Sequence, residues 1–217
     1  MRRVDPKRQE AQRRRILEAA VACFVRRGFH QTKTAEICAE AGMSPGNVFH
    51  YFPNKDAIIE AIVEEDRRET AALFAKLKDA DDILKEMLRS LDMLLEVLSD
   101  PAATRLGIEV MAEAMRNPKV GALVQRNEAE AKALLVETLE RAAARGQVDA
   151  TLDMNNAAVW LMALVDGAFS RAALEPSFNA QAQAPMLRMM VVRFLRPATS
   201  SLPEPPSPKP SPRGGRR

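Results

Sequence analysis

A stretch near the N-terminus most constrains how this chain can fold. Thr34 is a natural N-cap for a short helix, and Gly42 then interrupts that helix. A second helix can start at once, because the Ser44 side chain can cap it and Pro45 suits the first helical position, where a missing N–H is no loss. Two short helices joined by a tight turn that contains glycine are typical of a helix-turn-helix. We therefore predict this motif over about residues 33–52.

Apolar residues at helical spacing predict further helices on both sides of this motif. The helix before it ends at Gly28, and one of its faces is formed by Ile16, Leu17, Ala20, Val21, Phe24 and Val25. After the motif, apolar periodicity and interruptions by Pro and Gly predict helices over about 55–78, 81–99, 101–116, 118–145, 153–174 and 181–196. Aromatic strand formers are few, since the chain has one Tyr and one Trp. The predicted fold class is therefore all-α.

Composition argues against several classes of protein. No run of about 18 apolar residues is present, which argues against a membrane-spanning helix, and the charged start lacks the apolar stretch of a secretory signal. The only cysteines, Cys23 and Cys38, are too few for a disulfide framework or a cysteine-based metal cage. We therefore expect a reduced, cytoplasmic protein that needs neither a metal ion nor a cofactor.

Positive charge is concentrated at the N-terminal end of the chain. Residues 1–33 hold ten Lys or Arg and three acidic residues, whereas residues 34–217 hold 22 basic and 26 acidic residues. A basic end on an acidic body is typical of a nucleic-acid contact surface attached to a unit with another task. A basic arm that is merely solvated would have the same charge pattern, and charge alone does not separate the two interpretations.

The region around the helix-turn-helix also resembles a known family. The matching residues are Gly28-Phe29-His30, the segment TAEICAEAGMSPGNVFHYF at 34–52, and Asn54-Lys55. Over about residues 10–70 the chain resembles the TetR family of transcriptional repressors. The resemblance implies about nine helices, three of them in a DNA-binding head and the others in a ligand-binding and dimerisation body. It also implies a transcriptional regulator, a ligand-responsive repressor that binds a palindromic operator as a homodimer.

Composition and this resemblance together divide the chain into parts. They are a flexible basic arm (1–9), a DNA-binding domain (10–70), a regulatory and dimerisation domain (71–196) and a tail (197–217). Seven of the 21 tail residues are Pro, so we expect the tail to be disordered. The resemblance implies that the helices predicted at 153–174 and 181–196 pair with their mates in a dimeric four-helix bundle.

The second helix of the motif has side chains that can read bases. A recognition helix contacts bases with its N-terminal turn, which here holds Pro45, Gly46 and Asn47. Gly46 would let the backbone approach a base edge, and Asn47 can pair bidentately with adenine. His50, one turn further on, can reach a base edge or a phosphate. Each of these residues also has a structural explanation, since Gly46 can serve turn geometry and the two polar side chains can simply be exposed.

Other residues of the motif are candidates for phosphate contacts. Thr34 at a helix start and Lys55 after the motif suit phosphates, because helix N-termini and point charges attract anions. By analogy with the family, Tyr51 also contacts the duplex. Relatives usually carry Tyr where this chain has Phe49, which cannot donate a hydrogen bond to a phosphate. Either His50 or Tyr51 supplies that hydrogen bond, or the contact is absent.

The regulatory part offers a weaker signal for a small-molecule site. Flexible methionines near the single Trp can line an adaptable pocket, and the candidates are Met87, Leu91, Met111, Met115, Trp160 and Asp166. Ordinary core packing explains the apolar members equally simply. Glu109 and Asp166 lie in apolar surroundings and could orient a polar or cationic effector, and Asp166 could instead cap a helix or bridge a dimer interface.

Apolar residues of the last two predicted helices suit a subunit interface. They are Ala157, Ala158, Leu161, Leu164, Val165, Ala168, Phe169, Met189, Met190, Val192, Phe194 and Leu195. Small residues at Ala163, Gly167 and Ala168 would let two helices approach closely.

Three rival classes of function are compatible with a helical chain. A helical enzyme is disfavoured, because the only histidines, His30 and His50, lie in the expected DNA-binding part and no nucleotide-binding or hydrolase motif is present. No catalytic or metal-ligating residue is therefore predicted. A nonspecific architectural DNA-binding protein would bind random duplex as well as any operator, and a purely structural helical partner protein would show no salt-sensitive binding to DNA.

Overall fold

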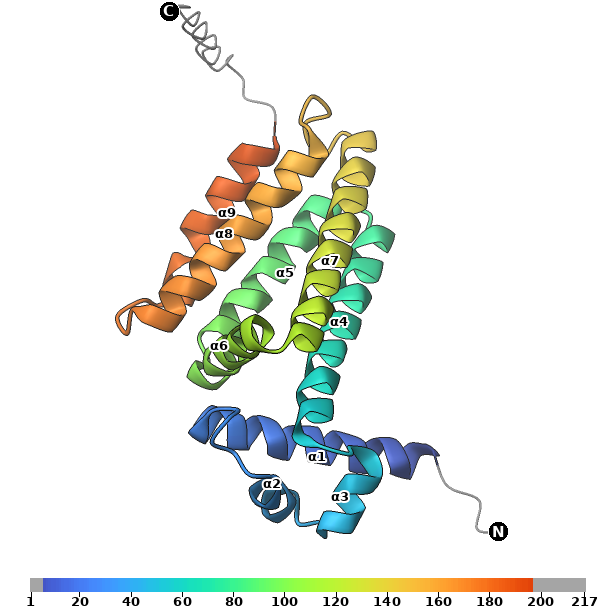
Figure 1. The fold of residues 1–217 in the computed structure, drawn as a ribbon. Coiled ribbons are helices and arrows are strands. Elements are labelled where there is room, and N and C mark those ends of the chain that lie inside the picture. Colours follow the sequence, from blue (N-terminus) through green and yellow to red (C-terminus); the bar gives the residue numbers. More distant parts are fainter. Residues whose placement is uncertain (1–5, 197–217) are drawn as a thin grey trace, which may run out of the picture.

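The computed structural model describes residues 6–196, and this part of the chain contains nine helices and no strand. A small head is formed by α1 (Pro6–Arg27), α2 (Thr34–Ala41) and α3 (Pro45–Tyr51), and α4 (Lys55–Asp79) leads out of it (Figure 1). The body is completed by α5 (Ile83–Leu98), α6 (Pro101–Arg116), α7 (Pro118–Ala144), α8 (Met154–Leu174) and α9 (Ala180–Leu195). The predicted all-α fold and the approximate bounds of its helices are confirmed.

The head is held together by one apolar cluster. Phe24 of α1, Ile37 of α2 and Val48 of α3 are all fully buried in it, together with Ile58 from the first turn of α4. Burying such side chains removes roughly 1.5–3 kcal/mol of unfavourable hydration each. The apolar faces of these helices therefore pack into one shared core, and this packing fixes the angle between α2 and α3.

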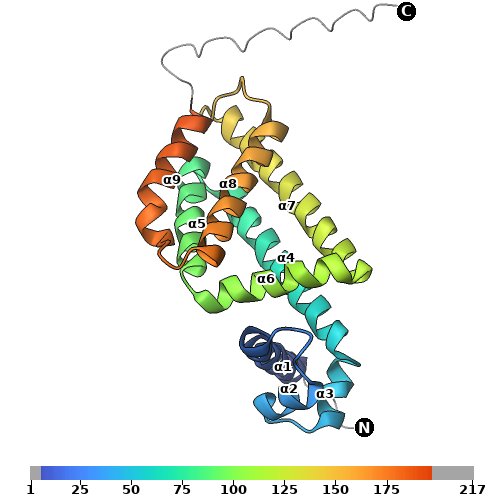
Figure 2. The same cartoon turned by 60° about the vertical axis from the view of Figure 1, so that its left-hand side comes forward.

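Residues of the body close the head core from the other side. Val120 of α7 belongs to the buried head cluster, and Leu106, Val110 and Ala114 of α6 pack against it. In both views α6 lies between the head and the other helices of the body (Figure 2). Helix α4 runs through the expected domain boundary at residue 70 without a break. Head and body therefore share packing as well as a helix.

Local signals end and restart the helices as expected around the motif. Gly28 and Gly42 both adopt positive φ, at 79° and 60°, a conformation that glycine takes without strain. Ser44 accepts a hydrogen bond from the backbone N–H of Asn47, and Pro45 occupies the first turn of α3. The helix-turn-helix predicted from the sequence is confirmed.

Two local expectations are corrected by the structure. Lys33, not Thr34, is the N-cap of α2, because Glu36 accepts a hydrogen bond from the backbone N–H of Lys33 at 2.8 Å and Thr34 is already helical. Helix α1 begins at Pro6, so residues 6–9 of the expected flexible arm are helical. The remainder of that arm and the whole expected tail lie outside the described residues.

Helix α8 is the one helix of residues 6–196 that is long and apolar enough to span a membrane by length and composition alone. It also contains Asp166 and Arg171, so its apolar residues do not form an uninterrupted run. A single helix of this kind is weak evidence for a membrane protein. Packing within the body explains the apolar character of α8 only at Ala157, Ala158 and Leu161, because most of the helix is not buried.

Candidate nucleic-acid interface

Helix α3 presents one face to solvent and anchors itself by the other. Val48 is 0% exposed and inserts into the head core, whereas Asn47 and His50 are exposed. Pro45 and Gly46 are exposed as well, so the whole N-terminal turn of α3 is accessible. In both views α2 and α3 lie at the end of the molecule that is remote from α9 (Figures 1 and 2). The side chains that were expected to read bases are therefore free to enter a groove.

Gly46 is not required by the fold of the isolated chain. A Cβ atom built at Gly46 meets nothing within 4 Å, and its φ is not in the positive range. The explanation by turn geometry, which was open from the sequence, therefore lacks support. An unneeded glycine on an exposed helix lowers helix stability by about 1 kcal/mol relative to Ala. Of the two explanations open from the sequence, close approach of an external partner is the one that the open space at Gly46 permits.

The aromatic residues of α3 differ in how they are placed. Phe49 is 47% exposed and carries no hydrogen-bonding group. Tyr51 is half-buried and packs against the head core, and its ring lies edge-on to His50 with 5.3 Å between the centroids. The exposed imidazole of His50 is therefore better placed than the Tyr51 hydroxyl to replace the hydroxyl that Phe49 lacks.

Lys55 does not present its charge in the way that the sequence suggested. Its Nζ donates to the carbonyl oxygens of Phe29, Thr32 and His30 at 2.5, 3.0 and 3.3 Å. The ammonium also lies 4.3 Å from the centroid of the Phe29 ring. Since its three N–H donors have intramolecular acceptors, the expectation of a free point charge for a phosphate is corrected. Lys55 holds the loop between α1 and α2.

Sequence reasoning missed Lys33 as a candidate phosphate contact. Its side chain is exposed and it directly precedes Thr34, which is half-buried at the start of α2. Exposed backbone N–H groups and positive charge at a helix start favour anions. A lysine immediately before a capped helix was the available signal in the sequence.

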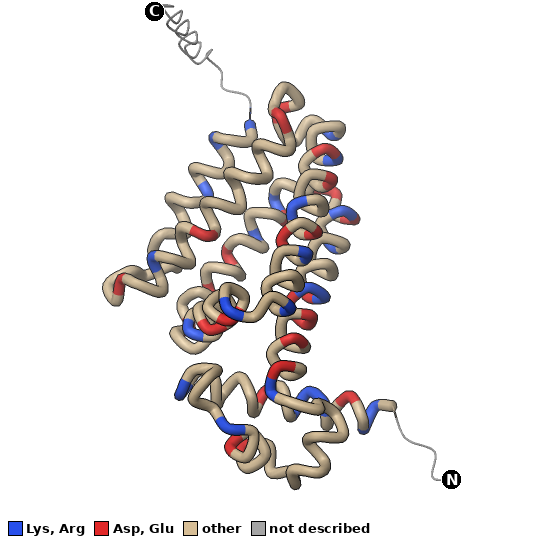
Figure 3. The backbone as a smooth tube through the Cα atoms, viewed as in Figure 1, with Lys and Arg blue, Asp and Glu red and all other residues tan. Residues whose placement is uncertain are grey.

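Much of the positive charge on α1 is neutralised within the head. Arg26 pairs with Glu40 at 2.6 Å, Arg27 pairs with Glu36 at 2.9 Å, and Arg14 pairs with its helix neighbour Glu18. Helix α3 itself contains no Lys or Arg, and Figure 3 shows it without blue segments. Helix α3 therefore offers hydrogen-bonding groups rather than positively charged side chains.

Sequence comparison identifies the family to which this architecture belongs. A profile of bacterial regulatory proteins of the tetR family matches residues 16–62, and a profile of the C-terminal domain of BetI-type transcriptional repressors matches residues 85–196. The chain belongs to the TetR family. It is a DNA-binding transcriptional repressor with a helix-turn-helix at its N-terminus, as the resemblance implied.

Individual relatives agree with this assignment over most of their length. The HTH-type transcriptional regulator UidR of Escherichia coli K12 is 28% identical over 190 residues, which are 87% of this chain and 96% of UidR. The structure of Salmonella enterica GusR is 33% identical and has a TM-score of 0.72. The superposition covers 90% of this chain and 99% of GusR. A transcriptional regulator from Saccharomonospora viridis in complex with choline is 25% identical, with a TM-score of 0.66 and coverage of 86% and 95%.

In the body of this TetR-family repressor, the expected effector residues do not share one environment. Met87 and Leu91 of α5 pack against the body core. In contrast, Met111, Met115 and Trp160 are 55%, 88% and 65% exposed. None of them, nor Asp166, lines the cavity that opens between α4 and α7. The grouping of these six residues into one pocket is therefore not what the structure shows.

That cavity is lined by side chains that the sequence did not single out. Its volume is about 60 Å³, and its lining is Asp66, Arg67, Thr70, Asn127, Glu128, Glu130, Ala131 and Leu134. Desolvation raises the pKa of Asp66. Desolvation also raises the pKa of Glu128, and the nearby negative charges of Asp166 and Asp66 raise it further. Asp166 on α8 has its own pKa raised by desolvation. All three carboxylates are nonetheless exposed to solvent.

Glu109, expected to orient an effector, has another task. Its Oε2 accepts a hydrogen bond from the backbone N–H of Phe29 at 2.8 Å. It therefore joins α6 to the head. The neighbouring Glu113, which the sequence did not single out, is 4% exposed and lies against His30.

The face of the body formed by α8 and α9 exposes large apolar side chains. They are Val159, Trp160, Leu174, Met186, Met189 and Met190. Ala163 and Gly167 are exposed at helical spacing from Trp160, and a Cβ at Gly167 would meet nothing. The sequence-based interface needs correction, because Ala157, Ala158, Leu161 and Leu195 are buried in the body's own core. Helix α8 is thus apolar on its core face and on an exposed face.

Proposed function

We propose that the protein represses transcription by binding a palindromic operator as a homodimer, with one α3 helix in the major groove of each half-site. The exposed N-terminal turn of α3 over a buried Val48 carries this proposal. A helix seated in this way can enter a groove about 12 Å wide without disturbing its own anchor. Cytoplasmic location follows from a chromosomal DNA target, and the function needs no catalytic group.

Specific roles follow from the exposed groups. Asn47 pairs with adenine, and the open space at Gly46 lets a base edge approach the backbone. His50 donates to a base edge or to the phosphate that Phe49 cannot reach. Lys33 and the N-terminus of α2 at Thr34 hold phosphates on the flank.

The second subunit docks on the exposed apolar face of α8 and α9. A patch of this kind on a soluble chain marks an interaction site, and small residues such as Gly167 allow close helix approach. Two-fold symmetry about this face presents two heads to half-sites spaced about 34–36 Å apart, one turn of DNA. The match between the two heads and this spacing determines operator affinity.

The effector is a small organic cation bound beside Asp66 and Glu128. Three observations support this part of the proposal: the cavity between α4 and α7, the carboxylates around it, and the choline bound by the relative from Saccharomonospora viridis. Desolvation, followed by the negative charges of Asp166 and Asp66, raises the pKa of Glu128, and a bound cation would stabilise its ionised form. By favouring one spacing of the heads, the bound effector would change operator affinity.

Genome-wide footprinting with the purified protein tests the DNA-binding part. A palindrome is expected, and the double variant Asn47→Ala, His50→Ala should bind it at least about ten-fold more weakly, since each good base contact contributes roughly 1–3 kcal/mol of discrimination. Competition with random duplex separates this outcome from architectural binding, in which both duplexes compete equally. Unchanged affinity of the double variant would remove α3 as the reading element.

Choline tests the effector part, with the uncharged isostere 3,3-dimethylbutanol as a control. Choline should shift operator affinity of the parent, and the isostere should not, because the carboxylates recognise charge. The variants Asp66→Asn and Glu128→Gln should bind operator normally and lose the response. An equal response to both compounds, or none to choline or to other quaternary ammonium ions, would contradict a cationic effector and leave operator binding intact.

A further inference from the structure

Two carboxylates of α6 reach into the head at the loop between α1 and α2. Glu109 accepts a hydrogen bond from the Phe29 backbone N–H at 2.8 Å, and Glu113 Oε2 lies 3.0 Å from Nε2 of His30. The Glu113 side chain is 5% exposed, and its Oε2 accepts no well-aligned hydrogen bond from the described residues. The imidazole of His30, itself 57% exposed, is thus the near partner of a buried charge.

Lys55 joins the same group from the head side. Burial lowers the pKa of Lys55, whereas the negative charges of Asp56 and Glu113 act in the opposite direction. The Lys55 ammonium in turn holds the backbone carbonyls of Phe29, His30 and Thr32. The charge of Glu113 therefore acts on the loop both through the His30 side chain and through Lys55.

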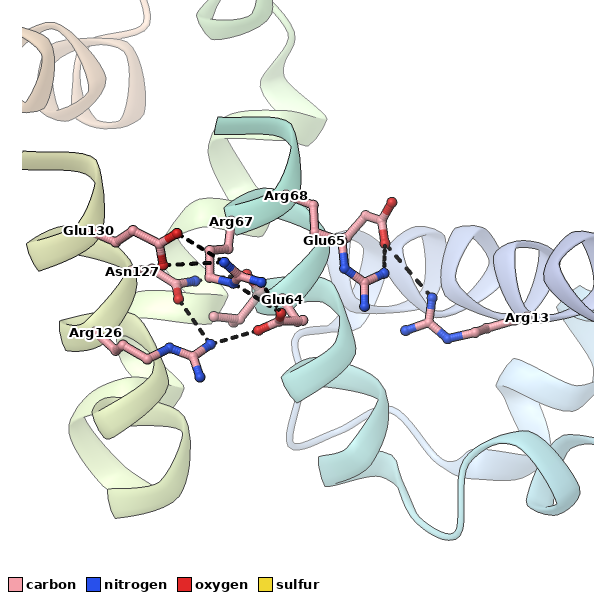
Figure 4. Close-up of polar contacts among 9 residues, drawn as sticks. Arg13, Glu64, Glu65, Arg67, Arg68, Arg126, Asn127 and Glu130 are labelled. Carbon is pink, nitrogen blue, oxygen red and sulfur yellow. Dashed lines mark hydrogen bonds and ion pairs between the residues drawn. The ribbon is translucent and has the colours of Figure 1, made fainter. Parts of the chain in front are cut away.

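The other connection between head and body is differently built. Helix α4 is joined to α7 by ion pairs of Arg67 with Glu130 at 3.0 Å and of Arg126 with Glu64 at 2.7 Å (Figure 4). The hydrogen bonds from Arg67 and Arg126 lower the pKa of Glu64 to about 2. On the head side of Figure 4, Arg13 reaches Glu65 of α4 at 3.8 Å. This network restrains α4 against α7, while the buried carboxylate contact belongs to α6.

We infer that Glu113 is a positioning residue that sets the placement of the head on the body through His30, and thereby the spacing of the two recognition helices. Moving His30 away would leave the buried Glu113 carboxylate without its nearest polar group, which is strongly unfavourable, so the loop must follow α6. Glu109 adds a hydrogen bond to the same loop. This inference rests on the proposed function, because head spacing matters only if a dimer reads two half-sites.

The test compares two duplexes, the full palindrome found by footprinting and a single half-site, with full-length variants. His30→Ala removes the partner of Glu113, and His30→Gln keeps an N–H donor at a similar reach. Glu137→Gln is the matched control, because it breaks an exposed ion pair with Lys78 between α4 and α7. Glu113→Gln probes the same contact from α6.

We expect His30→Ala to lose about ten-fold affinity for the palindrome, within the usual range of coupling between sites, and to bind the half-site normally. His30→Gln should recover most of the loss, and Glu137→Gln should resemble the parent. Parallel loss on both duplexes would reduce the contact to a support of the head's own fold and overturn the inference. So would parent-like palindrome binding by His30→Ala and Glu113→Gln. A parent protein that fails to prefer its palindrome contradicts the proposed function instead.

Discussion

Single side chains of the head divide into those that fold it and those that face outward. Val48 and Asn47 are adjacent in sequence, yet one is buried and the other exposed, because successive helix positions point about 100° apart. Phe49 is exposed at a position where the resemblance to the family implies Tyr. Gly28 and Gly46 show that the same residue type can serve either purpose.

Restoring a hydroxyl at position 49 should strengthen operator binding. In Phe49→Tyr the new O–H can donate to a phosphate, and a net hydrogen bond of about 0.5–1.5 kcal/mol corresponds to an affinity gain of a few-fold. The salt dependence should stay the same, because a hydroxyl releases no counterions. Fluorescence anisotropy across a salt series measures both quantities, with Phe49→Leu as the control. A gain in Phe49→Leu would show that the hydroxyl is irrelevant.

Two glycine-to-alanine variants should behave in opposite ways. Gly28→Ala places a Cβ at positive φ and 3.1 Å from Glu109 Oε1, so it should lower the free energy of unfolding by about 1–2 kcal/mol. Gly46→Ala meets no atom of the chain, so stability should be kept or increased while operator affinity falls. Urea unfolding and operator titration measure the two effects. Normal operator binding by Gly46→Ala would exclude close approach at that position.

Helices of the body differ in how their charges are compensated. On one side of α4, Glu64 is surrounded by Arg67 and Arg126, and its pKa is low. Asp66, two residues further, faces the cavity, and desolvation raises its pKa. The same helix therefore holds one stabilised and one destabilised carboxylate. A carboxylate of the second kind lowers the stability of the fold when it is ionised.

Asp66→Asn should raise the free energy of unfolding at neutral pH. The folded-state pKa of Asp66 lies above the unfolded value, so its destabilising effect is absent below the unfolded pKa, grows as pH rises through the window between the two values, and is complete above the folded pKa. The advantage of the variant should therefore be larger at pH 7 than at pH 4 in thermal unfolding experiments.

Asp149→Asn is the control with the opposite sign. Hydrogen bonds from Thr151 lower the pKa of Asp149, so this carboxylate stabilises the fold above its unfolded pKa, and that contribution is lost as pH falls through the folded value. The substitution should lower stability at pH 7. If both variants changed stability in the same direction, the assigned environments of these carboxylates would be wrong.

The whole molecule places its two working surfaces at opposite ends of a shared framework. The recognition helix lies at the end remote from α9, and α6 lies between head and body (Figure 2). Because α6 and α7 contribute residues to the head core, a movement of these helices would act directly on the head. The exposed apolar face of α8 and α9 is where we propose that two such molecules join.

Introducing a charge into that face should give a monomer. Trp160→Asp affects a side chain that is 65% exposed, so the fold should persist while a buried interfacial charge prevents dimerisation. Palindrome affinity should fall strongly, because two linked heads bind far more tightly than one. Met115→Asp on α6, 88% exposed, is the control and should remain dimeric. Sedimentation equilibrium decides the question, and a dimeric Trp160→Asp protein would place the interface elsewhere.

Local chemistry made much of the fold predictable from the sequence. Gly28, Gly42 and Pro45 end or start helices through their own backbone preferences, and apolar periodicity marks the buried face of each helix. The resemblance to TetR proteins depended on the same short stretch. The exposed turn of α3 could be anticipated because its anchor, Val48, lies within the same seven-residue helix.

Long-range packing decided the remainder. Lys55 was expected to be a free cation, but it donates to loop carbonyl oxygens more than 20 residues away in sequence. Trp160, expected to line a pocket, is exposed, and Glu113, which the sequence did not single out, is buried. Periodicity identifies the faces of a helix, but which neighbour covers each face depends on how the helices pack in three dimensions. For that reason the sequence alone determined the helix-turn-helix, and only the tertiary structure located the contacts of α6 that connect it to the body.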